Sequence, residues 1–477
     1  MSPHSKNSSL ETDPAGTGAR DPGTAARDTA VPDRRRAAVR SLRLAGCAAL
    51  LAVALTAGAA AVGGAREGRG APPAGARGRA ALAVPAGAEP AADIGALQRR
   101  LRDRPRDAVA WAALGLAHVE QARTDGDPSR YPRAERALER SLELRPGNDR
   151  ALAGRAALAA ARHRFADALT YADRALKANP YSERALCSRV DALVELGRYD
   201  DAARAADTAD ARRPGVPVFT RYAYVRELRG DVRTARRVLG QALAVASSPG
   251  DVAYVATQLG RLAWSQGEYP AALRHFARAL AADDTYLPAL EGRARARAAS
   301  GDADGAVEDL EAVVARAPLP GPLVALGELY EARGDTARAR AQYSLVGAWT
   351  ALARARGVDA DLDTALAAAD HGDRAAALRA ARAEWDRRRT VHTADALAWA
   401  LHVNGRDAEA LPYARRAAAP GYRDASFLHH LGVIESAVGH DREARRYLRA
   451  ALDLNPGFSP LGAREARALL DGREADR

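Results

Sequence analysis

The sequence predicts an all-α protein, a solenoid of repeated helix-turn-helix units, and two observations support that prediction. The first is composition: aromatic residues make up 5% of the 477-residue chain, there is a single Met, and Ala and Arg are abundant, whereas strands favour β-branched and aromatic residues. The second is a recurring glycine. Its spacing lies between 33 and 38 residues, which is typical of helical repeats, and it occupies positions Gly197, Gly230, Gly267, Gly301, Gly334, Gly372, Gly405 and Gly439.

An alanine lies five residues after each glycine, and two earlier alanines extend the series: Ala134, Ala168, Ala202, Ala235, Ala272, Ala306, Ala339, Ala377, Ala410 and Ala444. A glycine that ends a helix adopts the left-handed conformation without strain, and a small residue lets two helices cross closely. A large side chain follows most of these alanines at four residues, as at Leu138 and Phe276, and prolines such as Pro146 end the second helix. Each unit therefore needs a neighbour to cover its apolar face.

These landmarks resemble the tetratricopeptide repeat (TPR) family, which has a Leu-Gly pair in the first helix, a Gly at the turn, and Ala, an aromatic and Ala in the second helix. The resemblance covers about residues 108–458 and about ten units. Its best matches are Trp111, Leu114 and Gly115 in the first unit, Leu259, Gly260, Gly267, Tyr269, Ala272, Phe276 and Ala279 in the fifth, Leu326, Gly327, Tyr330, Gly334, Ala339 and Tyr343 in the seventh, and Leu431, Gly432, Gly439, Ala444, Ala451 and Pro456 in the tenth. The resemblance implies a right-handed superhelix with a concave groove.

Some units depart from the family pattern. Arg155 and Arg293 stand where the family prefers a small or apolar residue, and the eighth unit lacks most aromatic landmarks. The first unit carries extra residues between its helices, around Thr124 to Arg130. We expect the solenoid to occupy residues 93–477, with residues 460–477 forming a terminal helix that caps the last apolar face.

The amino-terminal part has a different character. Residues 1–43 read as a disordered basic cytoplasmic tail, and residues 44–65 carry no charge. A helix of that length spans about 33 Å, enough for a bilayer core. More arginines precede the segment than follow it, which favours a cytoplasmic amino terminus and an array outside the cytoplasm. A cleaved signal segment with small residues at 59–61 and a cytosolic protein with an unused apolar segment are the alternatives. Residues 66–92 are rich in Ala, Gly and Pro, which predicts a flexible linker.

Net charge says little about the partner. The formal charge is +11, but residues 108–477 hold 54 basic and 50 acidic side chains, so most of the excess lies before the repeats. This near balance argues against a nucleic-acid partner, because nucleic-acid binding needs a basic surface. Protein or peptide partners in the concave groove, and a membrane at residues 44–65, are the predicted contacts.

The sequence holds no catalytic constellation, so we expect no enzyme activity, no cofactor, no metal and no small-molecule substrate. Neither of the two lysines, Lys6 and Lys177, follows a glycine, which excludes a Walker-type phosphate loop. His429 and His430 are adjacent and point about 100° apart on a helix, so a structural role is favoured over metal binding. Cys187 is predicted to be a small, half-buried side chain. The run 387–389 is read as a solvated helix end, with an anionic contact as the alternative.

The register of the resembled family places six side chains in the groove as candidate protein-binding residues: Asp191, Tyr224, Arg261, Trp264, Arg295 and Trp399. Arg and aromatic side chains dominate the energetics of interfaces. For Trp264 and Trp399 the alternative is packing between neighbouring helices. The family's clamp for a chaperone's carboxy-terminal carboxylate uses Lys and Asn side chains, and with two lysines in the chain that ligand is not expected.

Anchor, linker and repeats together predict a membrane-anchored TPR scaffold that mediates protein–protein interactions at the bacterial cell envelope. The localisation that follows is a single-pass membrane protein with the array outside the cytoplasm, or a secreted protein after signal cleavage. The alternative function is a cytoplasmic regulatory TPR protein, possibly associated with nucleic acid, in which the apolar segment is not an anchor. Repeat scaffolds share a fold while their functions differ.

Overall fold

The computed structural model describes residues 90–125, 128–355, 362–419 and 421–475, all of which belong to one compact unit. Helices account for its architecture, and no strand occurs in these ranges. None of the described helices is long and apolar enough to cross a membrane. The predicted tail (1–43), membrane segment (44–65) and most of the predicted linker lie outside the described residues. The last three linker positions, 90–92, are helical, because α3 begins at Pro90 (Pro90–Asp103), and proline suits the first turn of a helix.

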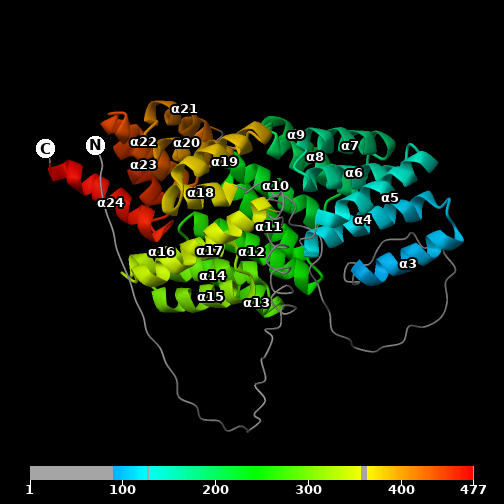
Figure 1. The fold of residues 1–477 in the computed structure, drawn as a ribbon, viewed down its shortest axis with the longest axis horizontal. Helices are drawn as coiled ribbons and strands as arrows, with labels where there is room; N and C mark the ends of the chain where they lie inside the picture. Colours follow the sequence, from blue (N-terminus) through cyan, green and yellow to red (C-terminus); the bar gives the residue numbers. More distant parts are fainter. Residues whose placement is uncertain (1–89, 126–127, 356–361, 420, 476–477) are drawn as a thin grey trace, which may run out of the picture. The chain divides into compact units, whose positions relative to one another are not determined.

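Antiparallel helix pairs follow one another along the chain (Figure 1). The first helices of the pairs are α4 (Ala108–Asp125), α6 (Asp149–Ala161), α8 (Glu183–Glu195), α10 (Val216–Leu228), α12 (Pro249–Ser265), α14 (Leu287–Ala299), α16 (Pro320–Ala332), α18 (Leu362–His371), α20 (Val391–His402) and α22 (Ala425–Ala437). The second helices are α5 (Tyr131–Leu144), α7 (Phe165–Ala178), α9 (Tyr199–Arg212), α11 (Val232–Val245), α13 (Tyr269–Ala282), α15 (Ala303–Arg316), α17 (Thr336–Ala355), α19 (Arg374–Arg387), α21 (Asp407–Ala418) and α23 (Asp441–Leu454).

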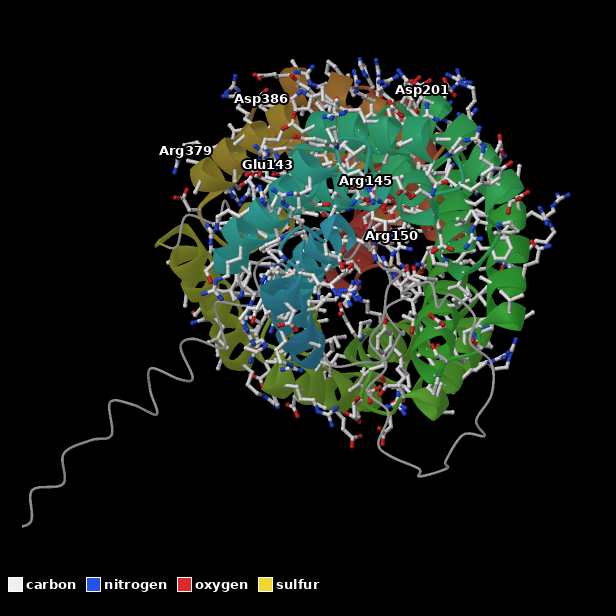
Figure 2. The ribbon with its side chains drawn as sticks, turned by 90° about the vertical axis from the view of Figure 1, so that its right-hand side faces the viewer. Glu143, Arg145, Arg150, Asp201, Arg379 and Asp386 are labelled. Atoms are coloured by element: carbon white, nitrogen blue, oxygen red, sulfur yellow. The ribbon has the colours of Figure 1, made fainter. Side chains whose placement is uncertain are left out.

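The two kinds of helix form two layers. Each first helix contacts the first helix of the next pair, as α8 contacts α10 and α10 contacts α12, whereas the second helices make no comparable contacts with one another. Because the first helices are closer together, the array curves toward them, and they form the inner layer. Figure 2 shows this curved path, with charged side chains such as Arg379 and Asp386 of α19 at its outer rim. A short 3-10 helix, Pro128–Arg130, precedes α5.

Turn glycines mark the ends of the first helices, as predicted. Seven of the eight landmark glycines have positive φ angles between 70° and 92°. Gly372 is the exception: α18 ends before it, but its backbone is not left-handed, so the prediction of a left-handed cap is wrong there. In the turn after α6, His163 takes the left-handed conformation with φ 55°. That turn therefore forms without glycine.

The landmark alanines pack where the helices of a pair cross, and every one of them is at most 2% exposed. The glycine of the Leu-Gly pair leaves room for a large side chain on the second helix of the same pair. A Cβ on Gly260 would lie 2.6 Å from the Phe276 ring, and one on Gly432 would lie 2.8 Å from the Leu448 side chain. Only a glycine lets the two helices approach this closely with a large side chain between them.

The two arginines that depart from the family pattern have local partners. Arg155 forms ion pairs with Glu135 and Glu139, at 3.1 and 2.9 Å. Arg293 binds the buried carboxylate of Asp309 through Nε and Nη2, at 2.9 and 2.7 Å. These units keep the helical packing because the charged group reaches a carboxylate on the neighbouring second helix.

Later parts of the array return to contact earlier ones, which the repeat pattern did not predict. The turn after α8 contacts the backbone that precedes α20. The turn after α10 contacts the backbone that precedes α22, where a Cβ on Gly230 would lie 2.5 Å from the carbonyl oxygen of Gly421. Asn455 is 1% exposed and donates from Nδ2 to the carbonyl of Trp264 at 2.9 Å. The terminal helix α24 (Pro460–Ala475) contacts α16 as well as α22 and α23. Successive turns of the superhelix are therefore packed against each other.

Candidate functional site

All six predicted groove residues lie on first helices of the inner layer, and Asp191 on α8, Tyr224 on α10 and Arg261 on α12 lie on consecutive ones. Arg261 is exposed, and within the described residues it makes no hydrogen bond or ion pair. Its charge acts on the hydroxyl groups of four half-buried tyrosines. Burial raises the pKa of each hydroxyl and Arg261 opposes that rise: Tyr224, Tyr254, Tyr286 and Tyr422. We call Arg261 and these tyrosines the Arg261 site.

A carboxyl group lies at the edge of the Arg261 site. Burial raises the pKa of Glu227 to about 7, while Arg261 opposes the rise and Asp424 adds to it. Burial also raises the pKa of Asp424, which accepts backbone hydrogen bonds from Ser426 and Phe427 at the start of α22. Near neutral pH, Glu227 is partly protonated, so it does not neutralise Arg261 fully. The site thus presents a cation among neutral phenols.

Asp191 is not free to bind a partner, because its carboxylate is engaged. Both of its oxygens lie 2.9 Å from Nε of Arg221, which also donates to the carbonyl of Pro217. Burial raises the pKa of Asp191 to about 6, and the Arg221 guanidinium works against that rise. The nearby thiol of Cys187 is 5% exposed, so this residue is more buried than predicted. The pair joins α8 to α10.

Trp264 and Arg295 have local roles. The Trp264 ring is partly buried and packs against a core that includes Leu262 and Phe276. Its carbonyl accepts the Asn455 hydrogen bond between superhelical turns. Arg295 forms a 2.9 Å ion pair with Glu291 one turn earlier on α14. For Trp264 the packing alternative fits the structure.

Trp399 lies in a buried polar cluster on α20 and is 7% exposed. Its Nε1 donates to Asp370 at 2.5 Å, and its ring stacks on His430 with centroids 4.2 Å apart. His430 in turn contacts both oxygens of Asp395 at 3.0 Å. Asp395 and Asp370 raise the pKa of His430 against burial, whereas burial lowers the pKa of His429. Packing between helices again fits this tryptophan, and the two histidines have structural partners.

One prediction about the arginine run 387–389 is wrong. Arg388 is not part of a solvated helix end, because it is 7% exposed and binds Glu195 and Glu384, which are 3% and 1% exposed. Its partners are anionic groups of this same chain, which matches the alternative of an anionic contact. Arg389 remains exposed and lies over the Trp385 ring at 5.4 Å.

Sequence reasoning missed the contribution of the later helices to the Arg261 site. Tyr422 and Asp424 precede α22, and His392 lies on α20, yet Arg261 on α12 acts on the pKa of Tyr422 and of His392. Burial lowers the pKa of His392 to about 4, so its imidazole is neutral at pH 7. No local pattern signals these residues, because they reach the site only when one superhelical turn packs on another.

A tetratricopeptide repeat family model matches the chain at residues 119–183, 223–286 and 257–321. The first span runs from the end of α4 through α7, and the other two together run from the second half of α10 through α15. No curated protein matches the sequence.

Among solved structures, the human IFIT1 dimer with m7Gppp-AAAA is 17% identical, covers 68% of this chain and 76% of its own, and has a TM-score of 0.45. The APC/C hetero-tetramer Cut9-Hcn1 is 14% identical, with coverage of 79% and 81% and a TM-score of 0.36. PilW, a type IV pilus biogenesis factor, is 20% identical, with coverage of 42% and 92% and a TM-score of 0.38. The family-model matches support tetratricopeptide repeats in the matched parts of this all-helical solenoid.

Proposed function

We propose that this protein is a scaffold that holds a segment of a partner protein against the inner layer at the Arg261 site. The observation that supports the proposal is an exposed guanidinium without a partner in the described residues, whose charge acts on four half-buried tyrosine hydroxyl groups. Arg and Tyr are enriched among the side chains that dominate binding energy. A carboxylate on the partner would supply the missing counter-charge, and its apolar groups would pack on the phenol rings.

The proposal includes an anchor and a location. Residues 44–65 would hold the array outside the cytoplasm at the bacterial cell envelope, with about ten repeat units carried on a flexible linker. Support comes from the sequence: an uncharged stretch of membrane-spanning length, preceded by more arginines than follow it. A cleaved signal would give the same array in secreted form.

The partner is tested by proximity labelling from a carboxy-terminal fusion in native cells, comparing the unaltered chain with Arg261→Glu. The matched control is Arg278→Glu, which reverses an exposed charge on the second helix α13. We expect a set of labelled proteins that disappears with Arg261→Glu and persists with Arg278→Glu, because only the first change repels a carboxylate at the site. Identical labelling by all three proteins would contradict the role of the Arg261 site.

The location is tested on the same cells by protease treatment of intact spheroplasts. Digestion of the array with the amino terminus protected supports the anchor and its orientation. A protected array together with labelling of cytosolic proteins would replace this proposal by the cytoplasmic regulatory function.

A further inference from the structure

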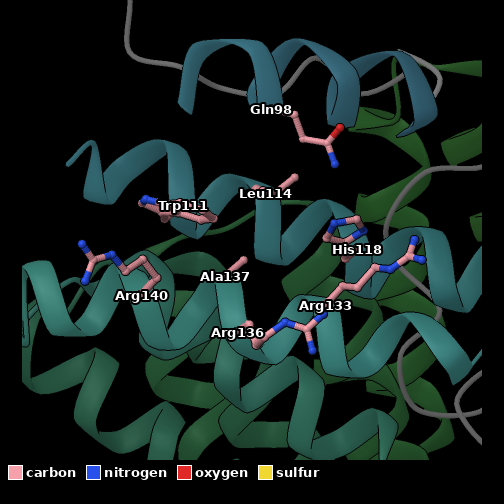
Figure 3. Close-up of a pocket in the computed structure, with 8 residues that line it drawn as sticks. All are labelled: Gln98, Trp111, Leu114, His118, Arg133, Arg136, Ala137 and Arg140. Atoms are coloured by element: carbon pink, nitrogen blue, oxygen red, sulfur yellow. The ribbon is translucent and has the colours of Figure 1, made fainter. Parts of the chain in front are cut away.

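A cavity of about 500 Å³ lies between α3, α4 and α5, at the amino-terminal end of the helix array (Figure 3). Its lining comes from all three helices, with Gln98 on α3, Leu114 on α4 and Ala137 on α5. The volume falls in the range of about 300–1,000 Å³ that is typical of small-molecule pockets. The cavity is separate from the Arg261 site, and the proposed function makes no use of it.

Two helical faces set the chemistry of this cavity. On α4, Trp111, Leu114 and His118 recur at three and four residues and so share one face. On α5, which lies beside α4, the same spacing places Arg133, Arg136 and Arg140 along one helix face. The result is an apolar floor beside a row of guanidinium groups, and no Asp or Glu is among the described residues that line the cavity.

Two of the three arginines have no partner to neutralise them. Arg140 forms a 2.8 Å ion pair with Glu143. Arg133 and Arg136 are exposed, and neither makes a hydrogen bond or an ion pair within the described part of the chain. Two such cations on one wall create a positive potential that an anion would stabilise.

The third observation is a buried polar atom without a partner. His118 is 5% exposed, and its Nδ1 has no hydrogen-bond partner among the residues that the structure describes. An unsatisfied buried polar group costs about 1–3 kcal/mol, and a hydrogen bond with a ligand would remove that cost. Burial lowers the pKa of His118, and the charges of Arg133, Arg130 and Arg136 lower it further. The imidazole is therefore neutral at pH 7 and able to donate or accept one hydrogen bond to a ligand.

The walls are held in place before any ligand arrives. Arg100 near the end of α3 binds Asp107 through Nε and Nη2, at 2.9 and 2.7 Å. The same carboxylate accepts the backbone N–H groups of Val109 and Ala110 at the start of α4. Trp111 donates from Nε1 to the carbonyl of Pro105 at 2.9 Å, which orients its ring along the cavity.

We propose that this cavity binds a small organic anion, a carboxylate or phosphate on a flat apolar body, with the anion on Arg133 and Arg136 and the body against Trp111 and Leu114. The polar end of the ligand, or a substituent beside it, would satisfy Nδ1 of His118. An anion bound by two guanidinium groups forms charge-assisted hydrogen bonds, which are stronger than neutral ones.

The test is isothermal titration calorimetry on the full-length protein with four probes: 1-naphthyl phosphate, 1-naphthoate, inorganic phosphate and 1-naphthol. We expect saturable binding of one naphthyl anion per chain. Inorganic phosphate and 1-naphthol should each bind at least about tenfold more weakly than the naphthyl anions, because each lacks one half of the recognised ligand. The stronger of the two naphthyl anions identifies the preferred head group. No saturable binding, or equal affinity for 1-naphthol, would overturn the proposal.

Variants place the binding in this cavity. Arg133→Gln/Arg136→Gln should weaken naphthyl-anion binding by about tenfold or more, and it leaves the fold intact because both side chains are exposed. The matched control is Arg145→Gln, which removes an exposed arginine just beyond the end of α5 and outside the cavity (Figure 2). Equal weakening by the control would show diffuse attraction of anions to a basic chain and reject the site.

A second variant separates binding from folding. His118→Phe removes the unpartnered nitrogen, so it should weaken binding while leaving the melting temperature unchanged or higher. Unchanged binding by this variant would remove His118 from the site.

Discussion

Arg388 and Glu195 are 193 positions apart in the sequence, and their side chains form a buried ion pair with 3.1 Å between Nη1 and Oε2. Glu384 binds Nε of the same arginine, and Arg387 donates to the other oxygen of Glu384 at 2.6 Å. Beside this pair, the hydroxyl of Tyr199 accepts the backbone N–H of Val391 at 2.7 Å. These contacts join α8 and α9 to α19 and α20, so one superhelical turn is bonded to the next.

Replacing Arg388 tests how much this contact contributes. Arg388→Met removes the guanidinium that pairs with both Glu195 and Glu384, while Arg387 still pairs with Glu384, and we expect the free energy of unfolding to fall by about 3–5 kcal/mol. The measurement is a urea unfolding curve followed by circular dichroism. Arg389→Met is the control, because that arginine is exposed and loses only a contact with a tryptophan ring. Similar losses from both variants would mean that the turns do not depend on the buried pair.

The close approach of α12 and α13 depends on a missing side chain at position 260. Gly260→Ala should lower the free energy of unfolding by about 1–3 kcal/mol, because the new methyl group would overlap the Phe276 ring. Gly240→Ala is the matched control: no atom lies within 4 Å of its Cβ position, and α11 is exposed there. That change should raise stability by up to about 1 kcal/mol through helix propensity. Thermal unfolding distinguishes the two, and destabilisation by the control would reject the packing explanation.

The carboxyl group of Glu227 should make stability depend on pH. Its pKa is raised from 4.5 to about 7 in the folded protein, so the unfolded chain releases its proton first as the pH rises. The wild type is therefore most stable below pH 4.5 with respect to this group and loses stability between pH 4.5 and 7. Gln stays neutral, so Glu227→Gln should be more stable than the wild type by about 1–3 kcal/mol at pH 8.

At pH 4 the difference between Glu227→Gln and the wild type should nearly vanish, since the Glu227 side chain is then neutral in the folded state and mostly neutral in the unfolded state. Urea unfolding at the two pH values provides the measurement. Glu443→Gln changes an exposed carboxylate on α23 and serves as the control. A constant difference between variant and wild type at both pH values would refute the titration of Glu227.

The Cys187 thiol should be unreactive while the protein is folded. It is 5% exposed, and burial raises its pKa from 9 to about 11. At pH 8 the thiolate fraction is then about 100-fold lower than at the ordinary pKa, and the thiolate is the reactive form. In a Cys47→Ser background, which leaves Cys187 as the remaining thiol, N-ethylmaleimide should react at least about 100-fold more slowly without denaturant than with it. Fast labelling of the folded chain would show that α8 opens readily.

Much of the fold could be predicted from sequence because its determinants are local. The left-handed turn at Gly267 and the buried Ala272 lie five residues apart, and both belong to one helix pair. Such landmarks recur at each pair because every pair packs its apolar face against the next pair in the same way. The number of tetratricopeptide units and the membrane segment stay predictions.

The candidate sites could be predicted only in part. Register alone placed Tyr224 and Arg261 on the inner layer, but it also selected Trp399, which is buried against Asp370 and His430. The amino-terminal cavity could not be predicted from the sequence, because Arg133 and Arg136 have the spacing of any exposed helix face. The proposal that these arginines bind an anion depends also on His118. Its Nδ1 is buried without a partner among the described residues, which results from the packing of three helices.

The sequence by itself determined the helices, their pairing and the layer to which each belongs, since these follow from helical period, turn glycines and small crossing residues within about 34 positions. Only the tertiary structure decided that Arg388 meets Glu195 and that Tyr422 reaches the neighbourhood of Arg261. The physical reason is that the path of a superhelix sums small rotations from every pair. Contacts between its turns depend on that sum, which no single repeat encodes.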